Sequence, residues 1–122
     1  KYTKARKELY QLFKDELDNN RFYLPSDRKD ANDSPFCLPI IFKNNDKDGF
    51  NKAKEICNDL GIETRPIISG FLGYQTCYKK YFNSESYYQN SIYLHNNGFY
   101  IGLYYGLKEK KIKQLINKLN NI

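Results

Sequence analysis

The sequence predicts an α/β fold in which a small sheet of about three strands has helices packed mainly on one face. Stretches with apolar residues at helical spacing alternate with short runs of β-branched and aromatic residues. The chain has 122 residues, a length typical of one domain, and 40% of them are hydrophobic. We therefore expect a single domain over residues 1–122, with parallel and antiparallel strand pairing both left open.

The predicted elements alternate between helix and strand along the chain. By residue number they are helix 2–19, polar loop 21–34, strand 36–42, helix 50–60, strand 62–68, loop 69–83 with one helical turn near 77–81, helix 84–94, turn 96–98, strand 99–105 and helix 108–122. Pro39 has no amide hydrogen, so its strand should lie near a sheet edge or a bulge there. Gly61 should end the second helix at the C′ position, and Ser84 should open the tyrosine-rich helix.

The formal charge of +6 suits an anionic partner such as nucleic acid or a phosphorylated substrate. Lysine, asparagine, isoleucine and tyrosine are all abundant, however, and the composition of an AT-rich genome explains the charge more simply. The chain also begins at Lys1 and contains no methionine, so we expect it to be a fragment of a longer protein. Any function it has would then be a share of the function of that parent protein.

Residues able to carry chemistry are few. Cys37, Cys57 and Cys77 are widely spaced, which predicts free thiols and a cytoplasmic location rather than a disulfide framework. Together with His95, the only histidine, they could supply one zinc site, but no closely spaced cysteine pair is present and we expect no bound metal. His95 has no nucleophile near it in the sequence, so we predict no catalytic residue. No apolar run approaches the ~20 residues that cross a bilayer.

Arg65 is the candidate binding residue. The chain has four arginines against sixteen lysines, and Arg65 lies in the middle of the predicted strand 62–68. A guanidinium is always charged and can bind phosphate or carboxylate oxygens through two donors at once. Two interpretations stand: Arg65 holds an anionic substrate, or it forms an ion pair with Glu63 or with a carboxylate on a neighbouring helix.

The stretch GIETRP at 61–66, followed by Gln75 and by NGFYIG at 97–102, resembles the C-terminal domain of the DegT–StrS family of sugar-nucleotide aminotransferases and sugar 3-dehydrases. The resemblance extends from the first helix to Ile122. It implies the small domain of a fold-type I enzyme whose cofactor, pyridoxal phosphate, is bound by a larger N-terminal domain absent from this chain. No lysine of this chain matches the cofactor-binding segment.

The resemblance also implies a function. The parent would act on nucleotide-linked keto sugars in deoxy- and aminosugar biosynthesis for surface polysaccharides, as a cytoplasmic homodimer. Arg65, Ser69 and Gln75 would bind the nucleotide-sugar substrate, no residue of this chain would bind the cofactor, and the fragment alone would be inactive.

Three positions depart from the family pattern. Related sequences commonly read SGN-x-x-RQP, whereas this chain has Phe71 in place of the asparagine and Tyr74 in place of the arginine. Leu103 stands where many relatives have asparagine. Three polar contacts are therefore replaced, which implies either a different substrate or an enzyme that has become weak or altered.

Two other functions remain open from the sequence. The stretch 97–105 is similar to the aromatic strand of an RNA-recognition motif, but Asn97 and Tyr100 occupy the places of its basic and small residues. The chain could still be a small basic module that stacks nucleic-acid bases on its aromatic side chains. It could also be a non-catalytic interaction domain that keeps the fold without the pocket.

Overall fold

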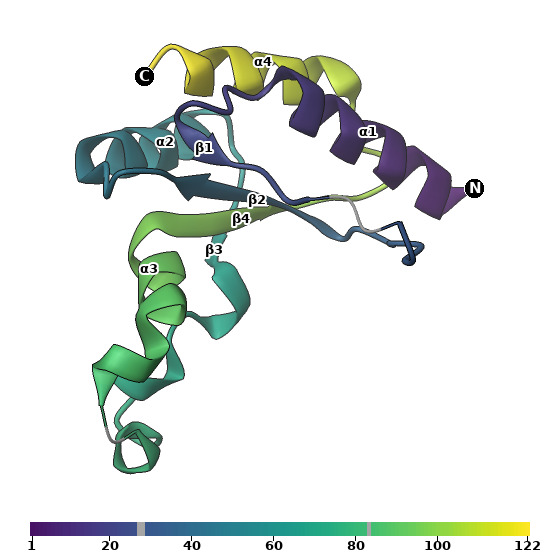
Figure 1. Cartoon of the computed structure of the whole chain (residues 1–122). Helices are drawn as coiled ribbons and strands as arrows, with labels where there is room; N and C mark the ends of the chain where they lie inside the picture. The colour runs from purple at the N-terminus through teal and green to yellow at the C-terminus, as the bar shows by residue number, and fades with distance from the viewer. Residues whose placement is uncertain (27–28, 83) are drawn as a thin grey trace.

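The computed structural model describes residues 1–26, 29–82 and 84–122. These residues form four α-helices and one four-stranded sheet, which confirms the α/β fold class (Figure 1). Single turns of 3₁₀ helix are labelled η. In chain order the elements are α1 (Tyr2–Glu16), β1 (Phe22–Tyr23), β2 (Cys37–Phe42), α2 (Lys47–Asp59), β3 (Thr64–Pro66), η1 (Ile67–Ser69), η2 (Leu72–Tyr74), η3 (Lys79–Tyr81), η4 (Glu85–Tyr88), α3 (Gln89–Asn97), β4 (Gly98–Gly102) and α4 (Glu109–Asn120).

The strands are ordered β1-β2-β4-β3, and every neighbouring pair is antiparallel. Leu38 of β2 lies opposite Ile101 of β4, which fixes the register at the centre of the sheet. The sheet has one strand more than the three expected, because β1 lies inside the predicted loop 21–34. Two residues are too few to show the alternation by which a strand is recognised in a sequence.

Pro39 lies at a point where β2 has a hydrogen-bonded neighbour on one side. It pairs with Tyr100 of β4, whereas β1 pairs only with Ile41 and Phe42. No second ladder therefore requires an amide hydrogen from Pro39. β2 is thus an inner strand and not the expected edge strand, but Pro39 lies outside the part of it that β1 covers.

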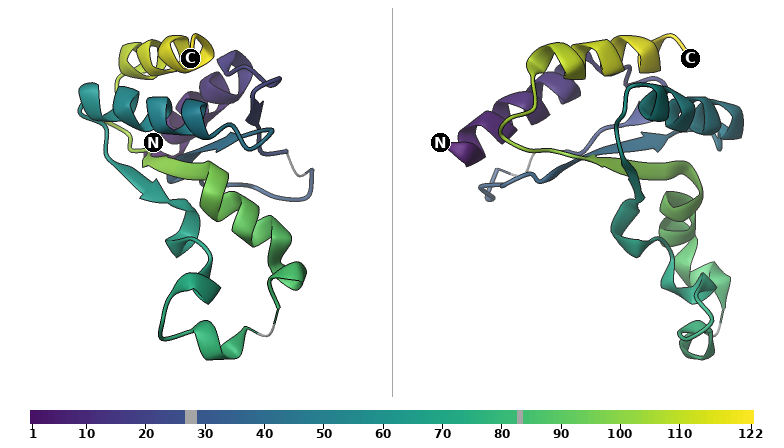
Figure 2. Two further views of the ribbon diagram at one scale, coloured as in Figure 1. Left: turned by 90° about the vertical axis from the view of Figure 1, so that its left-hand side faces the viewer. Right: turned by 180° about the vertical axis from the view of Figure 1, so that it is seen from behind.

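The two faces of the sheet differ. Figures 1 and 2 show α1, α2 and α4 on one side of the sheet and α3 extending away from the other side, which confirms that helices pack mainly on one face. Alternate residues of β2 and β4 are buried beneath the three helices: Leu38, Ile40, Phe42, Phe99 and Ile101. Each large apolar side chain fully buried in such a core contributes about 1.5–3 kcal/mol.

Helix α2 has a side-chain cap at its start and a glycine cap at its end. The Asp46 carboxylate accepts a hydrogen bond from the Gly49 amide over 2.9 Å, which satisfies one of the free amides of the first turn. At the other end Gly61 adopts a left-handed conformation with φ +61° and donates to the Asn58 carbonyl. The Ile62 amide donates to the Cys57 carbonyl over 2.8 Å, so the helix ends in a Schellman motif and the expectation for Gly61 is confirmed.

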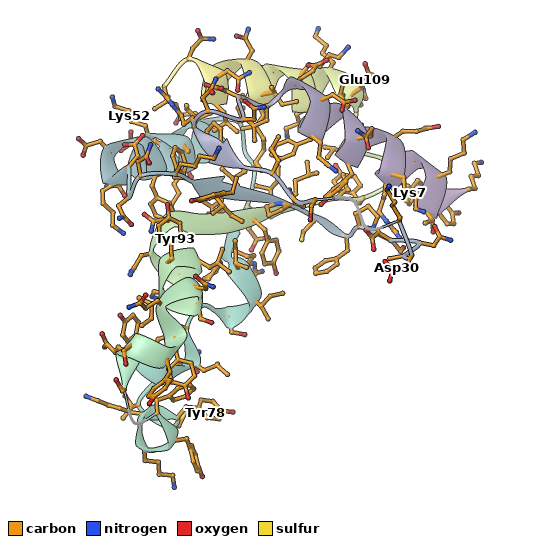
Figure 3. All side chains as sticks on the ribbon, viewed as in Figure 1. Lys7, Asp30, Lys52, Tyr78, Tyr93 and Glu109 are labelled. Atoms are coloured by element: carbon orange, nitrogen blue, oxygen red, sulfur yellow. The ribbon has the colours of Figure 1, made fainter. Side chains whose placement is uncertain are left out.

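Residues 67–82 and 84–97 form an extension that we call the arm. It comprises η1 to η4 and α3 and extends from the sheet on the side opposite α1, α2 and α4 (Figure 1). Figure 3 shows Tyr93 close to the sheet and Tyr78 at the far end of the arm. The Tyr93 hydroxyl donates to the Phe42 carbonyl over 2.7 Å, which fixes α3 to the end of β2.

The chain leaves the sheet earlier than the sequence predicts. The expected strand 62–68 is reduced to Thr64–Pro66, because Ile68 and Ser69 adopt left-handed conformations that no strand permits. The expected helix 84–94 is η4 followed by α3, and Ser84 does open it by accepting a hydrogen bond from the Ser86 amide. The expected turn 96–98 is instead the end of α3, followed directly by β4.

Candidate functional site

Arg65 is the central residue of β3, which is an edge strand of the sheet. It lies opposite Tyr100 in the register of β3 and β4, on the face that α1, α2 and α4 do not cover. Its side chain is 61% exposed. The guanidinium is therefore accessible to a ligand rather than enclosed in the core.

The ion pair considered from the sequence is present. The guanidinium of Arg65 lies 2.6 Å from the carboxylate of Glu63, whose side chain is 74% exposed. Ion pairs in water contribute only about 0–1 kcal/mol, because solvent screens them and holding two side chains together costs entropy. Glu63 can therefore orient Arg65 in the free protein without preventing it from binding a more highly charged anion.

A cavity of about 460 Å³, which we call the edge cleft, lies beside Arg65. Its apolar lining residues include Ile62, Ile101 and Ile112, and its polar ones are Glu63, Arg65, Tyr100, Tyr104 and Lys111. The cleft is formed where the connection from α2 to β3 runs beside the connection from β4 to α4. Its volume falls within the range of sites that bind small molecules.

Ser69 and Gln75, the other two predicted substrate-binding residues, lie on the arm. The side-chain amide of Gln75 donates to the backbone carbonyl of Ser69 over 3.4 Å, and both residues are exposed. Neither residue lines the edge cleft. The structure therefore brings Ser69 and Gln75 together on the arm, and of the three predicted residues Arg65 alone lines the edge cleft.

His95 joins the first turn of the arm to α3. Its Nδ1 atom accepts a hydrogen bond from the backbone amide of Phe71 over 3.0 Å. A Cβ atom at Gly70 would lie only 2.3 Å from Nδ1, so this approach requires glycine. The sequence offers one clue, a lone histidine followed by Asn-Asn-Gly, but no local pattern links it to a turn 24 residues earlier.

The three departures from the family pattern have structural roles. Phe71 is 5% exposed and its ring contacts those of Tyr74, Phe82 and Tyr88 at centroid distances of 5.0–5.6 Å. These four rings form a small cluster inside the arm, separate from the main core. Leu103 is also 5% exposed and belongs to the main core. The apolar replacements therefore coincide with packing positions.

The aromatic residues of the stretch 97–105 are divided between core and surface. Phe99 is buried, whereas Tyr104 and Tyr105 are exposed, with Tyr105 contacting the ring of Tyr2. A base-stacking sheet face would need its aromatic side chains together on the open side. Only Tyr100 points to that face from β4, and it contacts Phe36 edge-on.

The three cysteines lie in different environments. Cys57 is fully buried and burial raises the pKa of its thiol to about 11, while Cys37 is half-buried with its thiol pKa also raised by burial. Cys77, in contrast, is exposed. Within the ranges that the structure describes, no three histidine, cysteine, aspartate or glutamate side chains come together as metal ligands would.

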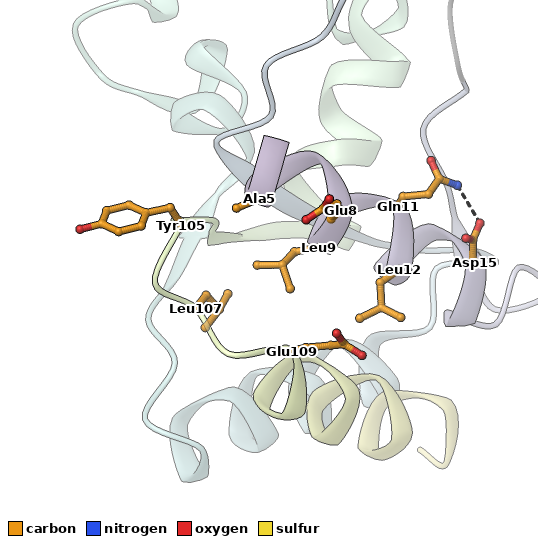
Figure 4. Close-up of a pocket in the computed structure, with 9 residues that line it drawn as sticks. All are labelled: Ala5, Glu8, Leu9, Gln11, Leu12, Asp15, Tyr105, Leu107 and Glu109. Atoms are coloured by element: carbon orange, nitrogen blue, oxygen red, sulfur yellow. Dashed lines mark hydrogen bonds between the residues drawn. The ribbon is translucent and has the colours of Figure 1, made fainter. Parts of the chain in front are cut away.

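A second cavity, of about 570 Å³, lies between α1 and α4 (Figure 4). Its apolar residues include Leu9, Leu12 and Leu107, and the charged residues that line it are all acidic: Glu8, Asp15 and Glu109. Carboxylates repel phosphate, so an anionic substrate would avoid this groove. Among the cavities, the edge cleft has the charge that a phosphorylated ligand requires.

The chain belongs to the DegT/DnrJ/EryC1/StrS aminotransferase family, because the model of that family matches residues 1–120. The resemblance inferred from the sequence is thus confirmed. No curated protein sequence matches the chain.

Solved structures share the fold over almost the whole chain. One is a GDP-4-keto-6-deoxymannose-3-dehydratase with a trapped PLP–glutamate geminal diamine, which is 26% identical with a TM-score of 0.75. The match covers 97% of this chain and 31% of the dehydratase chain. The E. coli GDP-4-keto-6-deoxy-D-mannose-3-dehydratase with bound hydrated PLP is 25% identical with a TM-score of 0.75. The match covers 96% of this chain and 30% of that dehydratase chain. A putative sugar aminotransferase from Streptococcus pneumoniae is 14% identical with a TM-score of 0.81, over 98% and 30%, and this shows the fold alone.

The chain therefore spans about 30% of the length of these proteins. Among the helices in the described ranges, none combines the length and the apolar content that crossing a bilayer requires.

Proposed function

We propose that residues 1–122 form the C-terminal, substrate-proximal domain of a pyridoxal-phosphate-dependent aminotransferase or dehydratase that acts on nucleotide-linked keto sugars. One observation carries the proposal: the chain shares its fold, at 25–26% identity, with 30–31% of two dehydratases that hold this cofactor. Membership of an aminotransferase family supports the same class of chemistry. The rest of the parent would then supply a larger domain that binds the cofactor.

The residues of this chain do not suit direct attachment of the cofactor. Pyridoxal phosphate, when bound, supplies the electron sink for the reaction. A lysine that bonds to it is typically desolvated so that its amine is nucleophilic. Among the described residues, Asn97 is the only polar or charged one that is buried. We therefore assign the cofactor to the missing domain and expect the isolated chain to be inactive.

In the parent, this chain would form one wall of the substrate site. Arg65 would bind the diphosphate of the sugar nucleotide, because its planar guanidinium matches two phosphate oxygens at once. Ser69 and Gln75 would approach the substrate from the arm. A cytoplasmic homodimer that makes deoxy- or aminosugars for surface polysaccharides fits these assignments.

The test uses the full-length parent, loaded with pyridoxal phosphate and supplied with GDP-4-keto-6-deoxymannose and glutamate. We expect Arg65→Gln to raise KM for the sugar nucleotide about tenfold or more, because a charge-assisted contact to phosphate is lost. Arg65→Lys should recover only part of this loss, since a single ammonium cannot contact two oxygens in a fixed plane. Lys110→Gln, which removes an exposed charge on α4, is the matched control.

Two outcomes would overturn the proposal. One is a parent that binds no pyridoxal phosphate or leaves nucleotide-linked keto sugars unchanged. The other is visible absorbance of a lysine adduct when residues 1–122 alone are mixed with pyridoxal phosphate, which would place cofactor binding in this chain. An Arg65→Gln variant with unchanged KM would remove Arg65 from the substrate site and leave the enzyme class intact.

A further inference from the structure

We propose that the edge cleft binds the nucleoside diphosphate part of the substrate, with Arg65 and Lys111 at the phosphates and Tyr104 against the base. This inference rests on the proposed function, and it adds two residues and a ligand orientation to it. Lys111 and Tyr104 lie outside the motifs that indicated the family from the sequence, at 61–66, 69–76 and 97–102, although the family match itself covers residues 1–120. Their role follows from the cleft itself, in which charge, aromatic surface and open volume occur together.

The charges of the cleft favour a phosphorylated ligand. Arg65 and Lys111 supply two cations, and among the described residues that line the cleft Glu63 is the one carboxylate. That carboxylate pairs with Arg65, whereas Lys111 has no ion-pair partner among the residues described. A diphosphate would satisfy Lys111 and compete with Glu63 for Arg65, since an exposed carboxylate carries less charge than a diphosphate.

Tyr104 provides an aromatic surface in the lining of the cleft. Its side chain is 58% exposed, so one face of the ring can accept a planar group. One edge of the ring lies near Gly106, where an added Cβ atom would lie 3.3 Å from the Cε2 atom of Tyr104. Stacking on an exposed tyrosine is a common way for proteins to bind a nucleic-acid base.

The cleft has room for such a ligand. Its volume of about 460 Å³ lies within the 300–1,000 Å³ that is typical of small-molecule sites. Gly102 lines the cleft, and a Cβ atom added there would meet no heavy atom within 4 Å. A side chain at position 102 can therefore start without a clash at Cβ, and a larger one provides a way to obstruct the cleft.

The experiment titrates purified residues 1–122 with GDP, and in parallel with guanosine and with pyrophosphate, by calorimetry and NMR at low salt. We expect saturable GDP binding with amide shifts at Gly102, Tyr104 and Lys111. Lys111→Gln should weaken binding about five- to tenfold, the range for one exposed charge-assisted contact. Lys110→Gln, one residue away but outside the cleft, should not change the affinity for GDP.

Gly102→Leu should abolish GDP binding by obstructing the cleft. Glu63→Gln should tighten GDP binding, because it frees Arg65 from its ion pair.

The three ligands separate the contributions to binding. GDP should bind more tightly than pyrophosphate, which lacks the base, and more tightly than guanosine, which lacks the phosphates. Equal weakening by Lys110→Gln and Lys111→Gln would show diffuse charge attraction and overturn the inference. Undiminished binding to Gly102→Leu would overturn it as well, because the ligand would then lie elsewhere. Circular dichroism of each variant confirms that a loss of binding is not a loss of fold.

Assays of the parent distinguish a failure here from a failure of the proposed function. If the parent converts GDP-4-keto-6-deoxymannose while Lys111→Gln and Gly102→Leu keep an unchanged KM, the cleft is not the nucleotide site although the enzyme class is right. If residues 1–122 bind GDP through the cleft while the parent lacks aminotransferase and dehydratase activity, the proposed function is wrong and the nucleotide site stands.

Discussion

The imidazole of His95 and the backbone amide of Phe71 are joined by a hydrogen bond of 3.0 Å that fixes the first turn of the arm. Because Nδ1 is the acceptor, the proton of the neutral ring is on Nε2. The bond lies next to three successive left-handed residues, Ile68, Ser69 and Gly70, with φ of 44°, 67° and 71°. This conformation is costly for a β-branched residue such as Ile68. His95 therefore helps to hold a strained turn that displays Ser69.

Replacing His95 should loosen this turn without unfolding the domain. In His95→Phe the ring remains but the acceptor is lost, which leaves the Phe71 amide without its partner at a cost of about 1–3 kcal/mol. In His95→Asn the side-chain oxygen can take the place of Nδ1, so most of the bond should survive. Amide hydrogen exchange at Phe71 measures the difference, and core amides such as that of Ile101 serve as the control. Equal exchange at Phe71 in both variants would show that the bond does not hold the turn.

Restoring the asparagine of the family pattern at position 71 should destabilise the arm. Phe71 is buried and contacts three other aromatic rings, so Phe71→Asn removes their packing and buries an amide without a partner. We expect a local cost of about 3 kcal/mol or more. Proteolysis should then cleave within the arm while the near-native melting of the main core persists. Leu103→Asn is the matched comparison, because Leu103 lies in the main core and its loss should lower the stability of the whole domain.

Features set by local chemistry were predictable from the sequence. The helices follow from apolar spacing, and the end of α2 follows from Gly61, because only glycine adopts its conformation without strain. The exposed position of Arg65 was also predictable. Successive side chains of a strand point to opposite faces of the sheet, and a charged side chain belongs on the face that the helices leave open. The ion pair with Glu63 was foreseen as one of two interpretations, and the structure shows that it exists without excluding the other.

Features set by contacts between distant segments were not predictable. β1 becomes a strand only because Phe22 and Tyr23 pair with β2, and two residues carry no pattern of their own. The stretch 62–68 has the composition of one long strand, yet it turns at Ile68, just before the Phe71 amide that bonds to His95 of α3. The edge cleft likewise combines residues from β3, β4 and α4, and Lys111 looks like any solvated lysine of an amphipathic helix until these elements are assembled.

Gly61 and Gly102 allow the cost of an unusual backbone conformation to be measured where no steric clash interferes. A Cβ atom at Gly61 or at Gly102 would meet no heavy atom within 4 Å, but only Gly61 has a positive φ, of 61°. Gly61→Ala should therefore lower the free energy of unfolding by about 1–2 kcal/mol. Gly102→Ala should leave it unchanged or raise it slightly, because alanine restricts the unfolded chain. Urea denaturation of both variants makes the comparison, and equal losses would show that the conformation of Gly61 carries no special cost.

The buried thiol of Cys57 should make folding sensitive to alkaline pH. Burial raises the pKa of this thiol from 9.0 to about 11, so between these values the folded protein keeps a proton that the unfolded chain has lost. The free energy of unfolding should fall as the pH rises through this window, by about 2–3 kcal/mol in total, and this group should have no effect below pH 9.

Tyrosines and lysines in general titrate in the same range, so the measurement compares the wild type with Cys57→Ala by urea denaturation between pH 8 and 11. The variant should start less stable, because it leaves a small cavity, and should lose less stability with rising pH. Parallel pH dependence in the two proteins would contradict a buried, protonated thiol at position 57.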